Sequence, residues 1–179
     1  MKETKKASKK VFECSFMELF EDEVILDNQK TSTRVYIKHP GAAAILPITK
    51  DHKIILIKQF RYPIQMINLE VPAGKKDDPK EDSFECAHRE LEEETGYVTN
   101  QMEFYKRIYP CVGYSDEYID LFIAKDCVKI DHPKEMDADE NIECLFFNPE
   151  EIQELIDSDQ IGDSKTLILL QHYLLKGKL

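Results

Sequence analysis

The sequence lacks any apolar run of the roughly 18 residues that a helix needs to cross a bilayer. Its first ten residues, MKETKKASKK, are basic and polar and contain no apolar signal-peptide core. We therefore expect no membrane association, a cytoplasmic location, and a frayed tail at residues 1–10.

Clustered cysteines are also missing. The five cysteines are scattered, odd in number and without C-x-x-C spacing: Cys14, Cys86, Cys111, Cys127 and Cys144. This pattern is typical of reduced thiols in a cytoplasm. It argues against both a disulfide framework and a zinc site.

Positive charge is in deficit. Lys and Arg number 24 against 35 Asp and Glu, which gives a formal net charge of -11. A chain this acidic offers no broad basic face for a nucleic-acid backbone, so we expect no nucleic-acid partner. A small phosphorylated ligand remains compatible, because bound cations neutralise local negative charge.

The length and composition of the chain fit one folded domain, because it has 179 residues and 42% of them are apolar. Residues 11–36 are expected to form two or three short strands with a turn at Asp27. Further strands are expected at residues 42–48, 54–60, 67–71, 103–108, 117–125 and 143–147. Helices are expected at residues 81–95, 148–156 and 164–175. This pattern predicts an α+β fold with a mixed sheet.

The helix expected at residues 81–95 carries an acidic cluster. Residues three and four apart share a helix face, so Glu90, Glu93 and Glu94 project together, whereas Glu92 points elsewhere. Like charges at this spacing repel by a few tenths of a kcal/mol, so stability does not account for them. Converging carboxylates are what Mg²⁺ or Mn²⁺ requires.

The simpler interpretation of this cluster is a solvated helix face, because charge runs are common. The surrounding sequence favours the metal site, since a strand ending in Pro-Ala-Gly at residues 72–74 and a charged loop at residues 75–80 come directly before the helix. Arg89 lies four residues from both Glu85 and Glu93. We expect it to pair with them and hold the carboxylates in fixed rotamers.

The segment from Gly74 to Tyr97 resembles the Nudix box, whose pattern is G-x5-E-x7-R-E-U-x-E-E-x-G-U with U a bulky apolar residue. Glu81 lies eight residues before Arg89, as the pattern requires, and residues 89–97 match its second half throughout. Gly74 lies seven residues before Glu81 rather than six, so the loop is one residue longer. On this match the chain is identified as a member of the Nudix family.

The resemblance implies a Nudix domain at residues 39–179, built as an α/β/α sandwich around a mixed β-sheet. Residues 1–38 are then a small N-terminal β element, which in relatives exchanges across a homodimer and stacks on the adenine of the substrate. Phe12, Phe16 and Tyr36 are candidates for that stacking, and core packing is the alternative for each.

Four segments are similar to ADP-ribose pyrophosphatases: residues 39–47, 57–63, 69–74 and 109–117. The last departs from that subfamily's S-P-G-x-S-D-E pattern, because Cys111 and Val112 replace the usual Ser-Pro. The resemblance implies a pyrophosphohydrolase that acts on a nucleoside diphosphate sugar, with ADP-ribose cleaved to AMP and ribose 5-phosphate. GDP-mannose or another sugar nucleotide is the alternative substrate.

The same resemblance gives expected roles to individual residues. The metal ligands for Mg²⁺ or Mn²⁺ are Glu90, Glu93, Glu94 and the backbone carbonyl of Ala73. The expected catalytic residues are Glu93, Arg89 and Glu140, with Glu140 acting on the attacking water and Asp137 and Asp139 as competitors for that role. The expected substrate-binding residues are Arg61, Glu70, Gly113, Ser115, Asp116 and Glu117. Among these, Arg61 has a planar fork that matches phosphate oxygens, and an ordinary surface arginine is the alternative.

Two other functions are compatible with the same fold. The first is a non-catalytic nucleotide-binding sensor, which is disfavoured because every acidic residue of the box is present. The second is a house-cleaning or RNA 5′-end hydrolase, which is disfavoured by the net acidity and by the Ser115-Asp116-Glu117 segment.

Overall fold

A computed structural model describes residues 2–134 and 141–176 of the chain. Its strands are β1 (Thr4–Glu13), β2 (Glu18–Ile25), β3 (Thr31–Lys38), β4 (Ala42–Thr49), β5 (Ile54–Arg61), β6 (Met66–Glu70), β7 (Ala73–Lys75), β8 (Tyr97–Val98), β9 (Gln101–Ile108), β10 (Ile119–Lys129) and β11 (Ile142–Phe147). Its helices are α1 (Ser83–Thr95), α2 (Pro149–Asp157), α3 (Ser164–Lys176) and the 3₁₀ turn η1 (Tyr62–Ile64).

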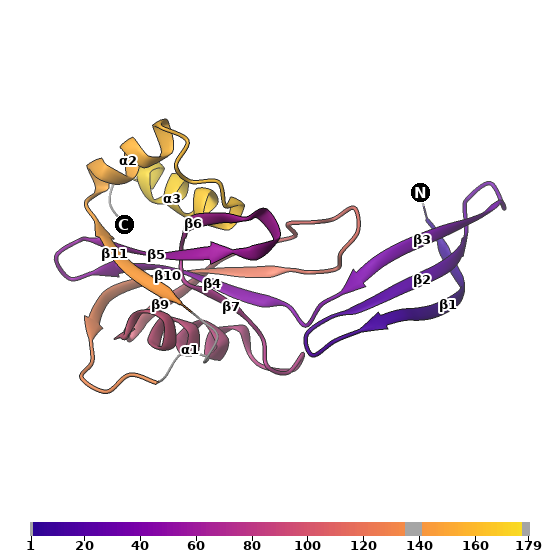
Figure 1. Cartoon of the computed structure of the whole chain (residues 1–179), viewed down its shortest axis with the longest axis horizontal. Helices are drawn as coiled ribbons and strands as arrows, with labels where there is room; N and C mark the ends of the chain where they lie inside the picture. The colour runs from indigo at the N-terminus through magenta and orange to yellow at the C-terminus, as the bar shows by residue number, and fades with distance from the viewer. Residues whose placement is uncertain (1, 135–140, 177–179) are drawn as a thin grey trace.

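The main sheet is mixed and lies between two helical layers. Its order is β11-β5-β4-β10-β8, with β6, β7 and β9 paired to β5, β4 and β10. β4 and β10 are parallel, and the other pairs are antiparallel. Helix α1 covers one face, and α2 and α3 cover the other (Figure 1). The predicted α/β/α sandwich is confirmed.

Strand β4 connects the two halves of the core. Every residue of this strand is buried, which explains why its sequence, AAAILPIT, has almost no polar side chains. Successive side chains point to opposite faces. Leu46 therefore packs with Leu169 of α3, and Ile45 packs with Leu91 of α1.

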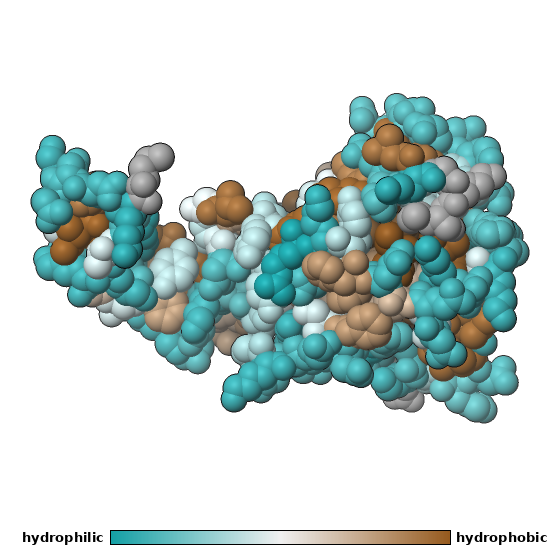
Figure 2. Space-filling view, turned by 180° about the vertical axis from the view of Figure 1, so that it is seen from behind, coloured by the Kyte–Doolittle hydropathy of each residue, from teal (hydrophilic) through white to brown (hydrophobic). Residues whose placement is uncertain are grey.

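The N-terminal strands form a separate three-stranded sheet, in the order β1-β2-β3. This sheet projects beside the main body as an arm (Figure 1), and Figure 2 shows that its surface is largely hydrophilic with small apolar patches. The prediction that residues 1–10 fray is wrong, because β1 begins at Thr4. Backbone pairing with β2 from Thr4 to Glu13 accounts for the difference. Cross-strand ion pairs accompany it: the Nζ of Lys6 lies 2.8 Å from Glu23, and that of Lys10 lies 2.5 Å from Glu18.

The other elements lie close to their predicted ranges, and three short ones were not predicted: η1, β7 and β8. Strand β7 is the important omission, because it pairs Ala73 with Ala44 of β4 and so fixes the start of the Nudix-like segment to the centre of the sheet. Within the described part of the chain, no helix combines the length and apolarity needed to span a membrane.

Candidate active site

Helix α1 is defined at both ends by local sequence. The side chain of Asp82 accepts a hydrogen bond from the Phe84 N–H at 2.8 Å and caps the first turn. Gly96 ends the helix in the left-handed region, with φ of 72°, and its N–H donates to the Glu92 carbonyl. The acidic residues therefore occupy fixed positions around a helix of defined length.

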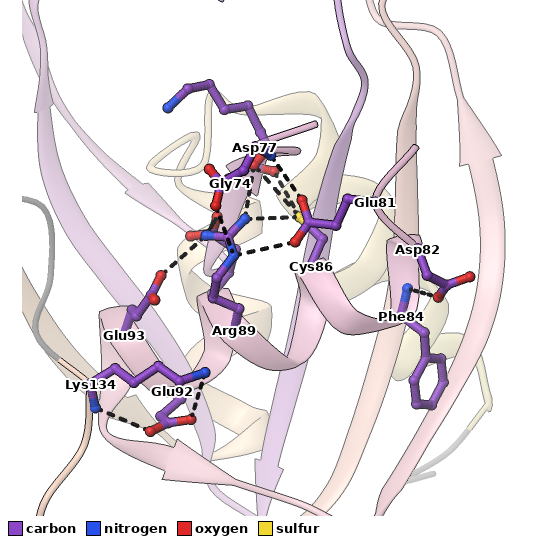
Figure 3. Close-up of polar contacts among 12 residues, drawn as sticks. Gly74, Asp77, Glu81, Asp82, Phe84, Cys86, Arg89, Glu92, Glu93 and Lys134 are labelled. Atoms are coloured by element: carbon purple, nitrogen blue, oxygen red, sulfur yellow. Dashed lines mark hydrogen bonds and ion pairs between the residues drawn. The ribbon is translucent and has the colours of Figure 1, made fainter. Parts of the chain in front are cut away.

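The acidic side chains of α1 lie on two different faces of the helix. Glu90 and Glu94 lie on the buried face, at 6% and 4% exposure, beside Leu91. Glu92 points away and accepts a hydrogen bond from the N–H of Lys134, whose Nζ also lies 3.4 Å from its carboxylate (Figure 3). Burying ionisable carboxylates is costly unless they have partners, so Glu90 and Glu94 are not an ordinary solvated face.

Arg89 lies at the centre of a carboxylate network (Figure 3). Its Nη1 donates to Glu90 at 2.6 Å and to Glu93 at 3.1 Å, and its Nε donates to Glu81 at 3.4 Å. Burial alone would lower the pKa of Arg89, but the charge of Glu90 and the hydrogen bonds with Glu81 and Glu93 raise it. The expected partner Glu85 is not among the carboxylates within ion-pair distance of Arg89 in the described residues; Glu81, at the end of the preceding loop, is a partner instead.

The backbone that precedes the loop lies directly against the glutamates. A Cβ atom added to Gly74 would lie 2.1 to 2.5 Å from the carboxylate atoms of Glu90, so only glycine leaves room for this side chain. Glu94 accepts a hydrogen bond from the N–H of Ala73 at 2.8 Å. The backbone of residues 73 and 74 therefore packs directly against the carboxylates of Glu94 and Glu90.

This donor set fits a hard divalent cation. Carboxylates and backbone oxygens are the ligands that Mg²⁺ and Mn²⁺ prefer. Among the described residues, no group of three or more His, Cys, Asp or Glu side chains is arranged to hold a metal ion by itself. The space beside Gly74 that accommodates the Glu90 carboxylate is the structural feature that suits a metal site.

Arg61 and Glu70 form a second charged group, on the hairpin of β5 and β6. Arg61 donates to Glu70 through Nε at 2.7 Å and through Nη2 at 2.8 Å. Lys165 of α3 donates to the same carboxylate at 2.5 Å. The hydrogen bonds with Glu70 raise the pKa of Arg61, and the charge of Glu94 raises it further, so this group and the acidic face of α1 interact electrostatically.

Sequence reasoning missed Lys165. The only signal in the sequence was a single lysine near the start of a strongly apolar helix, and nothing linked it to a glutamate 95 positions earlier. The residue is 7% exposed, so its role became visible only in three dimensions.

Lowering the pH is expected to weaken the contribution of Glu70 to stability. Burial alone would raise its pKa, but Arg61 and Lys165 lower it from 4.5 to about 2. The stabilisation is therefore fully present above about pH 4.5 and is lost as the pH falls through about 2. We expect Glu70→Gln to be less stable than wild type by on the order of 3 kcal/mol at neutral pH. Urea unfolding at pH 7 and pH 3 measures this gap, and an equal gap at both values contradicts the assignment.

The loop before β10 holds the junction with the N-terminal sheet. The N–H of His39 donates to Asp116 at 2.8 Å, and the N–H of Asp116 donates to the Ile37 carbonyl at 3.0 Å. Ser115 accepts from the N–H of Glu117 at 3.1 Å. Gly113 has open space on its Cβ side. These four predicted substrate residues thus lie together, and Ser115 and Asp116 have structural partners.

The N-terminal arm approaches the loop of the Nudix-like segment. A cavity of about 520 Å³ lies between them and is lined by Phe16, Lys38, His39 and Lys76 among others. Phe16 is 42% exposed, whereas Tyr36 stacks on Phe20 with ring centroids 5.7 Å apart. Of the predicted stacking aromatics, Phe16 therefore borders a cavity and Tyr36 is engaged within its sheet. Glu140, Asp139 and Asp137 lie outside the described residues.

A mixed sheet between helical layers, with the acidic α1 seated against Gly74, defines the Nudix class of domains. The NUDIX domain family model matches residues 38–170. The chain belongs to the Nudix family, as the sequence predicted.

Two relatives resemble the chain along nearly its whole length. It is 36% identical over 173 residues to the ADP-ribose pyrophosphatase of Bacillus subtilis (strain 168), covering 97% of this chain and 93% of that protein. It is 37% identical over 172 residues to the methanol dehydrogenase activator of Bacillus methanolicus, covering 96% and 92%. A crystal structure of an ADP compounds hydrolase matches with a TM-score of 0.84 at 20% identity, covering 100% of this chain and 98% of that one, which supports the fold.

Proposed function

We propose that the protein is a Mg²⁺-dependent pyrophosphohydrolase of nucleoside diphosphate sugars that converts ADP-ribose to AMP and ribose 5-phosphate. The observation that carries the proposal is the buried acidic face of α1, with Glu90 and Glu94 packed against the backbone at Ala73 and Gly74. The near full-length similarity to an ADP-ribose pyrophosphatase supports the substrate.

Glu90, Glu93 and Glu94, with the carbonyl of Ala73, are the proposed metal ligands. They would hold a divalent cation, which would neutralise the charge of the pyrophosphate and lower the pKa of a bound water. Arg89 fixes the rotamers of Glu90 and Glu93 through the hydrogen bonds of its Nη1. The carboxylate of Glu140, with Asp139 and Asp137 as competitors, is proposed to accept the proton of the attacking water.

Arg61 is the proposed phosphate-binding residue. Its Nε and Nη2 are committed to Glu70, which leaves the N–H groups of Nη1 for phosphate oxygens. Gly113, Ser115, Asp116 and Glu117 are proposed to border the rest of the substrate, together with Glu70. GDP-mannose is the alternative substrate, because Cys111 and Val112 depart from the ADP-ribose pattern.

We also propose a cytoplasmic homodimer in which the N-terminal β segment, residues 1–38, reaches the site of the partner. Phe12 and Phe16 support this, because both are more than 40% exposed on the arm and are available for stacking on a base. Sedimentation as a stable monomer contradicts the dimer without affecting the reaction class.

The purified protein is expected to release AMP from ADP-ribose with Mg²⁺ and to stop when EDTA is in excess, because the metal supplies the charge neutralisation. The panel is ADP-ribose, GDP-mannose, ADP-glucose, FAD and NADH, scored by chromatography for released monophosphate. Preferential release of GMP assigns GDP-mannose instead. Hydrolysis of no member of the panel, or equal rates in EDTA, contradicts the proposal.

A further inference from the structure

Lys165 is a buried cation in the first turn of α3. It is 7% exposed, and its Nζ lies 2.5 Å from Glu70 and 3.1 Å from Asp163. Removing an ammonium group from water costs several kcal/mol unless close partners compensate. A buried lysine at this position therefore needs a reason beyond helix formation.

The carboxylate of Glu70 is shared between two cations. Its Oε2 accepts from Nη2 of Arg61 at 2.8 Å and from Nζ of Lys165 at 2.5 Å, while its Oε1 accepts from Nε of Arg61 at 2.7 Å. With both oxygens occupied, Glu70 is held in one orientation. Because a guanidinium is planar, fixing two nitrogens of Arg61 fixes the direction of the third, Nη1. Within the described residues, Nη1 makes no hydrogen bond.

Helix α3 is also anchored to the same region through Thr166. The hydroxyl of Thr166 accepts from the N–H of Val71 at 2.9 Å and donates to Asp163 at 2.6 Å. Asp163 also accepts from the N–H of Thr166 at 2.9 Å. Thr166 is fully buried at 0% exposure, so this anchor alone docks the helix start beside Val71. Lys165 and Thr166 thus share Asp163 as a partner, but Lys165 alone of the two contacts Glu70 and Thr166 alone of the two contacts Val71.

We propose that Lys165 is a positioning residue for pyrophosphate binding, acting on Arg61 through Glu70. Lys165 holds the carboxylate of Glu70, Glu70 holds the guanidinium of Arg61, and Nη1 of Arg61 is thereby kept available to the substrate. The charge of Glu94 already acts on Arg61, which brings this chain of contacts into electrostatic range of the proposed metal ligands. This inference rests on the proposed function, because it assigns the phosphate-binding role to Arg61.

The test is a double-mutant cycle on Lys165 and Arg61. Lys165→Met is expected to raise the KM for ADP-ribose about tenfold, equal to about 1.4 kcal/mol of binding free energy, with a smaller change in kcat, because the charged hydrogen bond that holds Glu70 is lost. In an Arg61→Met background the same change is expected to alter KM less than about twofold, because the group on which Lys165 acts is gone. Calorimetric affinity for ADP-ribose in EDTA provides a second readout without turnover.

The matched control is Thr166→Val, which removes the hydroxyl contacts of α3 with Val71 and Asp163 while keeping the side chains of Lys165 and Glu70. This variant is expected to lower Tm without raising KM, because Thr166 contributes to the packing of α3 and does not contact Glu70 or Arg61 in the described residues. If Lys165→Met does not fold, Lys165→Gln is measured against the same criteria. An equal rise in KM for Thr166→Val, or a full effect of the Lys165 change in the Arg61→Met background, overturns this inference alone. A wild type that neither hydrolyses nor binds ADP-ribose overturns the proposed function as well.

Discussion

Replacing Glu94 by glutamine is expected to lower kcat for ADP-ribose about a thousandfold, equal to roughly 4 kcal/mol of transition-state stabilisation. Glu94 is buried at 4% exposure, and glutamine removes its charge with almost no change in shape. The glutamine oxygen still accepts from the N–H of Ala73, so Tm is expected to stay close to the wild-type value. Steady-state kinetics with Mg²⁺ and a thermal melt measure the two quantities.

Glu92→Gln is the matched control for this change. Glu92 lies on the same helix and has the same charge, but its partner is Lys134 on the other side (Figure 3). We expect this variant to retain kcat within about twofold, because Glu92 is not among the proposed metal ligands and its partner Lys134 is exposed. Equal losses in the two variants would mean that general charge on α1, rather than one carboxylate, accounts for the activity.

Adding one methyl group at Gly74 is expected to reduce activity about a hundredfold. The new Cβ would lie 2.1 Å from Oε1 of Glu90, far inside van der Waals contact, so the carboxylate must move. No left-handed φ is found at Gly74, so backbone strain does not contribute. Displacing one proposed metal ligand therefore lowers metal affinity and kcat together. Kinetics of Gly74→Ala across a Mg²⁺ titration measure both effects.

Gly162→Ala provides the control for that substitution. A Cβ at Gly162 meets no atom within 4 Å, and its φ lies outside the left-handed region. This variant is expected to match wild type in kcat and in Mg²⁺ dependence. Wild-type activity in Gly74→Ala contradicts the importance of the contact between β7 and Glu90.

Local patterns in the sequence were sufficient for the central sheet and for α1. The apolar residues 42–48 predicted a strand, and the structure forms β4 there and buries all of its residues. Asp82 and Gly96 are chemically suited to begin and end a helix, and the observed caps are these two residues. The separation of Glu92 from Glu90 and Glu94 followed from the 3.6-residue helical repeat.

Long-range partners were not predictable from local patterns. Strand β1 looked like a basic tail, because its stabilising carboxylates lie on β2. Arg89 was expected to pair along its own helix with Glu85, but it pairs with Glu81, which lies at the end of the loop before the helix. Lys165 meets Glu70 across 95 positions of sequence. In each case the interaction depends on a tertiary approach that no local spacing encodes.

Binding of Mn²⁺ to the substrate-free protein tests the central claim most directly, because it detects the metal site without assuming a substrate. Titration followed by electron paramagnetic resonance is expected to show saturable binding to wild type and to Glu92→Gln. The affinity of Glu94→Gln is expected to be weaker by at least about tenfold. Absence of saturable binding to wild type, or equal affinities in all three proteins, would contradict a metal site on the acidic face of α1.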